Sequence, residues 1–169
     1  MSMRIFLVAL GLAVALTRGA TACSCGWVHE PGTPLLSDGS PVPTPDELAE
    51  QPFLFLGTVE SVRVIPTGDP DMDLLHAAGA DITFRVELAW RGTYTSSTVT
   101  IHTGSVGGGC GYSFGLGRCY LVFASRDDQG VPGTDICTRT TSIDRAIDLL
   151  PYVYAFLGAP RVPGAQRLK

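Results

Sequence analysis

Lysine is almost absent from this sequence: Lys169 is the only one, and the arginines are scattered singly along the chain. The formal net charge is −4. A protein that binds nucleic acid needs a concentrated basic surface to neutralise phosphates. The sequence lacks such a surface, so we expect no nucleic-acid partner.

The sequence also lacks a long apolar stretch. Its longest run, residues 5–16, is shorter than the roughly 20 residues that a membrane-spanning helix needs. Arg4 precedes this run, and the small residues Ala20-Thr21-Ala22 follow it, which is typical of a signal peptide. We therefore predict a signal peptide at residues 1–22 and an exported, acidic chain that begins at Cys23 and forms one domain. No transmembrane segment is expected.

Catalytic and cofactor motifs are also scarce. The glycines at 107–109 and 111 follow a predicted strand, but neither the Gly-Lys-Ser/Thr of a phosphate-binding loop nor a helix signal comes after them. The three histidines, His29, His76 and His102, are widely separated. We expect no catalytic residues, no cofactor and no metal site belonging to the protein itself.

All five cysteines, Cys23, Cys25, Cys110, Cys119 and Cys137, lie in the predicted exported chain. Cysteines in an oxidising compartment usually form disulfides. A zinc site is the alternative, but the one close pair has a single residue between its cysteines, fewer than zinc motifs usually have. Because five is an odd number, disulfide pairing leaves one thiol over.

The middle of the chain reads as a series of β-strands. The strongest signal is the alternation of apolar and polar residues from Ile82 to Trp90. Phe53–Ile65 is apolar on both faces at its start, and Gly57 suggests a bulge in a curved sheet or barrel. We predict strands at 53–65, 82–90, 98–103 and 119–124, and a last short strand leading into Cys137.

Helices are expected on both sides of these strands. A proline-rich loop over 26–45 leads into a short helix at Asp46–Glu50, and a helical turn is possible at Met72–Ala78. Thr141–Asp144 matches a capping box, which predicts a helix from that point with a kink at Pro151. Its apolar stripe would be Ile143, Ile147, Leu150, Tyr154 and Leu157.

This pattern indicates a mainly β fold. A five-stranded, OB-fold-like barrel with the short N-terminal helix and the C-terminal helix packed on it is the best model, although a sandwich has the same pattern. The domain would span residues 23–158, and residues 159–169 would form a flexible tail.

Four features, in this order along the chain, resemble a known family. They are Cys23-Ser24-Cys25 at the predicted cleavage point, the strand Phe55–Val59, Cys110-Gly111-Tyr112, and Cys137–Thr140. Together they resemble the netrin-like domain, in particular the N-terminal domain of the tissue inhibitors of metalloproteinases. The resemblance covers nearly all of residues 23–157.

The resemblance implies an OB-type barrel, which agrees with the pattern of strands. It also implies disulfides Cys23–Cys110 and Cys25–Cys137, and leaves Cys119 as the free thiol. The chain lacks the third bridge of the inhibitory domain and the cysteine-rich C-terminal subdomain of that family.

The resemblance further implies an inhibitory edge formed by Cys23, Ser24 and Cys25. The α-amino nitrogen and carbonyl oxygen of Cys23 would chelate the catalytic zinc of a target metalloendopeptidase, and Ser24 would enter its specificity pocket. The partner would then be an extracellular zinc protease.

Two alternatives remain open. Domains of this class also bind extracellular proteins without inhibiting a protease, as adhesion or scaffolding modules. In addition, Ala20-Thr21-Ala22-Cys23 is similar to a bacterial lipobox, in which the cysteine sulfur carries a lipid anchor. A lipidated and acylated Cys23 could neither chelate zinc nor form a disulfide.

Overall fold

The computed structural model describes residues 23, 25–27, 29–69, 77–92, 96–105 and 109–164. The predicted signal peptide and most of the possible helical turn at Met72–Ala78 lie outside these residues. The described elements are α2 (Pro45–Glu50), β1 (Phe53–Ile65), β2 (Gly79–Arg91), β3 (Thr98–Gly104), β4 (Cys119–Arg126), β5 (Pro132–Thr134), β6 (Thr141–Ser142) and α4 (Leu150–Leu157).

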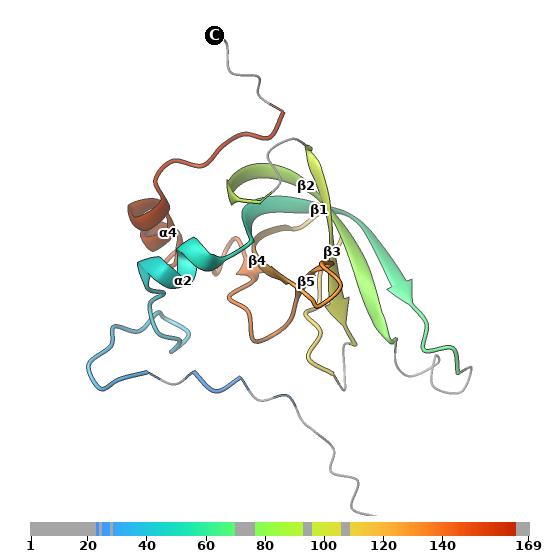
Figure 1. Ribbon diagram of the computed structural model, residues 1–169, viewed down its shortest axis with the longest axis horizontal. Helices are drawn as coiled ribbons and strands as arrows, with labels where there is room; N and C mark the ends of the chain where they lie inside the picture. Colours follow the sequence, from blue (N-terminus) through green and yellow to red (C-terminus); the bar gives the residue numbers. More distant parts are fainter. Residues whose placement is uncertain are drawn as a thin grey trace, which may run out of the picture.

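Five strands close into a barrel (Figure 1). They follow the order β1-β2-β3-β5-β4, and β1 pairs with β4 to close the circle. All these pairings are antiparallel except that of β3 with β5, which is parallel and joins only His102 to Gly133 and Thr103 to Thr134. The two-residue strand β6 is added outside β4. The predicted five-stranded, OB-fold-like barrel with two helices is confirmed.

The long strand β1 pairs with β2 along its whole length and with β4 at its start. The register with β2 shifts between Leu56 and Gly57, but the extra residue is Glu87 of β2, so the bulge lies on the partner strand instead of at Gly57 as predicted. A Cβ atom at Gly57 would lie 3.0 Å from the Arg85 carbonyl oxygen and 3.0 Å from the Phe55 ring. The glycine therefore allows β1 to bend closely against its neighbours.

Two apolar clusters share the strands β1 and β4. Alternate residues point into the barrel, and the residues between them point outward beneath the helices. This explains why the start of β1 is apolar on both faces. The cluster inside the barrel includes Phe53, Phe55, Ile82, Phe84, Ile101, Tyr120 and Val122. The cluster beneath the helices includes Leu48, Leu54, Trp90, Leu121, Phe123, Ala146, Leu149 and Val153.

Helix α2 begins at Pro45, one residue before the predicted start. The Thr44 side chain accepts a hydrogen bond from the Glu47 amide, and the Glu47 carboxylate accepts one from the Thr44 amide at 2.7 Å. This capping box satisfies backbone donors that the first helical turn leaves without partners. Leu48 is fully buried beneath the helix. Helices α2 and α4 lie side by side at one end of the barrel (Figure 1).

The predicted start of the C-terminal helix is wrong. Thr141 and Ser142 form β6, which pairs with Leu121 and Tyr120, so the capping-box motif belongs to a strand. Turns follow, and α4 begins only at Leu150. Pro151 then lies in the first helical turn, where its missing N–H needs no partner, so the expected kink does not arise.

The predicted apolar stripe of this helix is correct only for Leu150 and Leu157, which pack against the cluster beneath the helices. The late start changes which residues face the barrel: Ala146, Leu149 and Val153 are buried, whereas Ile147 is 76% exposed and Tyr154 is also exposed. The Trp90 indole donates a hydrogen bond to the Gly158 carbonyl at 3.0 Å, which attaches the end of α4 to β2.

The segment that follows α4 is more ordered at its start than the expected flexible tail. Arg161 and Ala89 exchange two backbone hydrogen bonds, of 2.7 and 2.8 Å. Pro163 is buried. The chain is thus held against β2 beyond residue 158, and residues 165–169 lie outside the described part.

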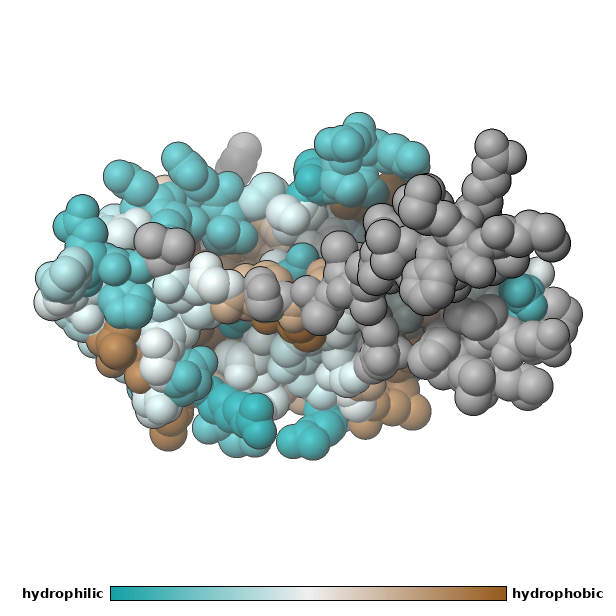
Figure 2. Space-filling model, turned by 90° about the horizontal axis from the view of Figure 1, so that it is seen from below, coloured by the Kyte–Doolittle hydropathy of each residue, from teal (hydrophilic) through white to brown (hydrophobic). Residues whose placement is uncertain are grey.

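The surface of the described residues carries separate apolar side chains. On the face seen in Figure 2, hydrophobic side chains form small groups bordered by hydrophilic ones. None of the helices in the described part of the chain is long and apolar enough to cross a membrane.

A substitution on β4 tests the outer cluster. Leu121 is fully buried, so Leu121→Ala should lower the free energy of unfolding by about 2–5 kcal/mol through lost contacts and a residual cavity. Leu116 is 69% exposed, and Leu116→Ala should change the free energy by no more than about 0.5 kcal/mol. Urea unfolding with the disulfides intact measures both, and equal effects would contradict the assignment of the core.

Candidate functional site

Two loops that follow different strands come together at the candidate site. Cys110 follows β3 and Cys137 follows β5. Gly111 and Asp135 form an isolated antiparallel bridge, and the Ile136 amide donates to the Cys110 carbonyl at 2.9 Å. Two cysteines far apart in the sequence therefore lie in neighbouring backbone segments.

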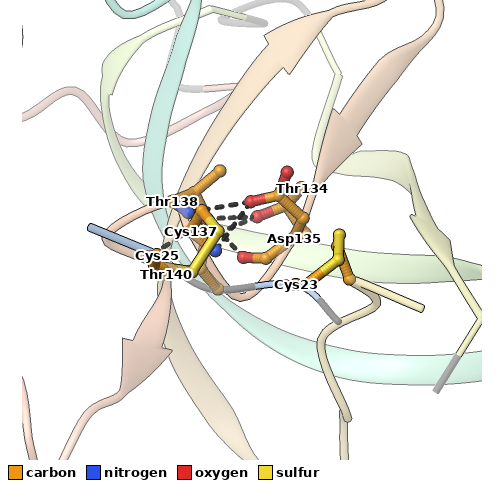
Figure 3. The surroundings of a disulfide bond; sticks show 8 residues. Cys23, Cys25, Thr134, Asp135, Cys137, Thr138 and Thr140 are labelled. Carbon is orange, nitrogen blue, oxygen red and sulfur yellow. Dashed lines mark hydrogen bonds between the residues drawn. A yellow bond between two sulfur atoms is a disulfide. The ribbon is translucent and has the colours of Figure 1, made fainter. Parts of the chain in front are cut away.

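The N-terminal segment is attached to both loops. Cys23 is bonded to Cys110 with 5.5 Å between their Cα atoms, and Cys25 is bonded to Cys137 with 5.0 Å between theirs. This is the pairing that the resemblance implies. Figure 3 shows both cysteines of the segment beside the turn that carries Cys137. Ser24, the other predicted residue of the edge, lies outside the described residues.

The bridges span 87 and 112 residues of chain. In the chain-entropy model, loops of this length correspond to about 4–5 kcal/mol of stabilisation each, because each bridge restricts the unfolded chain. Both bridges hold the same short segment, so they fix Cys23 and Cys25 to the barrel at two points.

Asp135 shapes the turn that presents Cys137. Its Oδ1 atom accepts hydrogen bonds from the Cys137 amide at 2.8 Å and the Thr138 amide at 2.9 Å (Figure 3). An aspartate that accepts from amides two and three residues later closes a turn without help from a helix or strand. This carboxylate therefore holds the backbone that carries Cys137.

Threonines attach this turn to β4. The Phe123 amide donates to Thr140 Oγ1 at 2.9 Å, and the Phe123 carbonyl accepts from Thr134 Oγ1 at 2.9 Å. Thr134 also shares hydrogen bonds with the hydroxyls of Thr138 and Thr140. The sequence reasoning missed this cluster. Its only signal is the run of threonines around Cys137.

Arg139 joins the turn to the segment that follows Cys25. Its side chain is only 9% exposed, and its guanidinium lies over the Trp27 ring, 4.4 Å from the ring centroid. Arg139 Nη1 donates to the Pro41 carbonyl at 2.7 Å, and Nη2 lies 3.7 Å from Glu47 Oε2. Burial lowers the pKa of Arg139, while Glu47 and Asp38 oppose that change.

Two clefts flank this stack. The larger, with a volume of about 550 Å³, extends towards Leu36 and the turns before α4, and the smaller, of about 290 Å³, extends towards α2. Trp27, Thr138 and Arg139 line both. The stack therefore forms the wall between two hollows beside the N-terminal segment.

Cys119 stands apart from the site. It is a free thiol, as expected, at the first position of β4 and opposite Thr58 of β1. Partial burial raises the pKa of the Cys119 thiol, and the nearby Glu87 carboxylate raises it further. The thiolate form is thereby disfavoured.

In the described part of the chain, no group of three or more histidine, cysteine or acidic residues is placed to hold a metal ion. His102 Nδ1 instead lies 3.0 Å from Asp81 Oδ1 on the outer face of the strands. Asp81 also pairs with Arg63. This cluster is a set of surface contacts between neighbouring strands.

A motif that the sequence reasoning passed over is Gly-x-Ser-x-Gly, at residues 111–115 with Ser113 in the centre. In serine hydrolases this motif lies on a sharp turn between a strand and a helix. Here, Ser113 is exposed in a loop that leads into strand β4, and no helix follows the loop directly. The surroundings therefore do not support a nucleophilic role for Ser113.

Comparison with models of known protein families gives no match, and comparison with curated protein sequences gives no significant match. The netrin-like resemblance therefore rests on the motifs, and it remains a prediction.

The environment of Cys119 predicts slow alkylation of the native protein. Since its pKa is raised, less thiolate is present at a given pH than for an unhindered cysteine, and the rate should keep rising with pH beyond the range in which a small thiol has reached its plateau. Mass spectrometry of iodoacetamide adducts against pH measures this, with glutathione as the control. A plateau at lower pH than for glutathione would contradict the burial of the thiol.

Proposed function

We propose that the chain is exported, cleaved before Cys23, and acts as a secreted protein-binding domain of the netrin-like class that inhibits a zinc metalloendopeptidase. The amine and carbonyl of Cys23 would bind the catalytic zinc of the target. The observation that supports this most is the attachment of Cys23 and Cys25 to adjacent loops of the barrel by separate disulfides.

The chemistry of the terminus is suited to this role. An α-amine has a pKa of roughly 7.7–8.0, so it loses its proton at modest cost and becomes a nitrogen ligand. Together with the carbonyl oxygen of the same residue it forms a five-membered chelate. The Cys23 sulfur is used in the bridge to Cys110, which leaves nitrogen and oxygen as the donors.

Rigidity adds to affinity. A flexible terminus loses conformational entropy when it binds, and rigidity before binding reduces that cost. The two bridges, the Asp135 turn and the threonine cluster all hold Cys23 and Cys25 in one place before any target is present.

Export is supported by the same bridges. Disulfides form and persist in oxidising compartments outside the cytosol, which agrees with the predicted signal peptide. The lipid-anchored alternative requires a thioether at the Cys23 sulfur. That sulfur is bonded to Cys110, so the bridge favours the unmodified form.

A non-inhibitory binding or adhesion module is the second candidate. The two clefts beside Trp27 favour it, because a recess lined by aromatic, polar and charged side chains is a typical ligand surface. Such a module would use the clefts, and a free Cys23 amine would not matter to it.

The low lysine content permits a direct test. In the Lys169→Arg variant of the cleaved protein, the Cys23 α-amine is the only primary amine. Carbamylation with cyanate removes its ability to bind zinc, so the inhibition constant against a susceptible zinc endopeptidase should rise by about 100-fold or more, equivalent to ~2.7 kcal/mol. Inhibition by the unmodified protein should weaken about tenfold per pH unit below the amine pKa, because the proton must then be removed first.

The matched control is the same protein with one alanine added before Cys23, which keeps a free amine but moves it away from the carbonyl of Cys23. This form should also fail to inhibit. Full inhibition by either the carbamylated or the extended protein would exclude zinc chelation by Cys23 and would favour the binding module.

A further inference from the structure

The N-terminal segment and the turn after β5 are joined at matching intervals. Cys25 is bonded to Cys137, and two residues later in both segments Trp27 stacks on Arg139. In both segments, the residue that forms the disulfide is thus followed two positions later by the residue that forms the cation–π contact. Gly26, between the two, has open space where a Cβ atom would lie, so packing at this residue adds no restraint of its own.

Arg139 is itself held from the other side. The hydrogen bond from Nη1 to the Pro41 carbonyl ties it to the proline-rich loop, and the Glu47 carboxylate near Nη2 belongs to the capping box of α2. Its guanidinium therefore has a fixed plane for the indole to stack on. The three segments that meet there are residues 25–27, the loop at Pro41, and α2.

The hydrogen bonds of Arg139 do not explain its burial. Nη2 makes no hydrogen bond to the described residues, although its exposed area is negligible. A buried donor without an acceptor costs roughly 1–3 kcal/mol, which other interactions of Arg139 must offset. The ion pair with Glu47 is one of them. The stack on Trp27 is another, and it uses the flat face of the guanidinium instead of its N–H groups.

We propose that Arg139 is a positioning residue, which acts through Trp27 to fix the direction in which the N-terminal segment lies on the barrel. The disulfide sets the distance between the two segments, but rotation about its bonds leaves the residues after Cys25 free to swing. The stack removes that freedom. The inference rests on the proposed function in one respect only: in an inhibitor, the direction of the segment would determine how Cys23 meets the zinc of the target.

The stack can be weakened without removing the core of the domain. Trp27 is 39% exposed and lies between two clefts, so Trp27→Leu leaves both apolar clusters intact. Arg139→Lys keeps the positive charge near Glu47 but loses the planar guanidinium group that stacks on Trp27. Arg126→Lys is the matched control, since Arg126 lies over the Phe53 ring at 4.7 Å, in a contact that involves no residue of the N-terminal segment.

Two readouts separate positioning from stability. Trp27→Leu and Arg139→Lys should each lower the backbone NMR order parameters of residues 25–27, and should raise the inhibition constant by about tenfold, the factor expected for a stack worth roughly 1.4 kcal/mol. For Trp27→Leu, the urea midpoint should fall no more than it does for Arg126→Lys, whereas Arg139→Lys also loses the hydrogen bond to the Pro41 carbonyl and should lower the midpoint further. The effects of the double variant should be little larger than those of either single variant, because both substitutions remove the same contact.

Unchanged order parameters at residues 25–27 in both variants would overturn the proposal, as would an equal change in Arg126→Lys. Order parameters are measured without a protease, so they separate this proposal from the proposed function. Lower order parameters together with no inhibition by any form of the protein would reject zinc-protease inhibition and still support the positioning role of Arg139.

Discussion

The attachment of Cys23 and Cys25 to two adjacent loops is the constraint on which the rest of the structure depends. On each side of β5 the barrel is joined by only two residue pairs, and one of these two seams is the parallel contact between β3 and β5. Cys110 follows β3 and Cys137 follows β5, so a segment bonded to both spans the continuation of that seam. The Gly111–Asp135 bridge lies beneath it. The same bonds that hold the terminus therefore also hold the barrel closed.

Short-range polar contacts restrict the backbone around the two disulfides, which the covalent bonds alone do not fix. Asp135 sets the backbone that carries Cys137, and the hydroxyls of Thr134 and Thr140 fasten that backbone to Phe123. Arg139 then adds the stack on Trp27. This turn has no regular secondary structure, but nearly every polar group in it has a hydrogen-bond partner within the protein, which makes it rigid. Rigidity of this kind suits a segment that must meet a partner in one orientation.

The parts of the fold that depend on local pattern could be predicted from sequence. Alternation over Ile82–Trp90 and the apolar start of β1 identify strands because side chains on a strand alternate between two faces. The short helix α2 was also predicted from local residues, although its cap at Thr44 was not. The similar motif at Thr141 failed, because pairing with Leu121 of β4, a contact between distant residues, outweighs a local helix signal there.

The site could be predicted only in part. The five cysteines are visible in the sequence, but their pairing came from a resemblance, since spacing alone allows many arrangements. The threonine cluster and the stack of Trp27 on Arg139 join residues that are far apart in the chain and carry no motif. The burial of Arg139 has no signal in the sequence, because burial at that position is set by the tertiary fold.

The central claim is that Cys23 ends in a free amine while its sulfur is bonded to Cys110. The intact mass of the natively exported protein, before and after reduction and thiol labelling, tests it most directly. The account predicts a chain that starts at unmodified Cys23, with one labelled thiol before reduction and five after it. A mass increased by a diacylglycerol and an acyl group, a chain that starts at another residue, or three labelled thiols before reduction would contradict it.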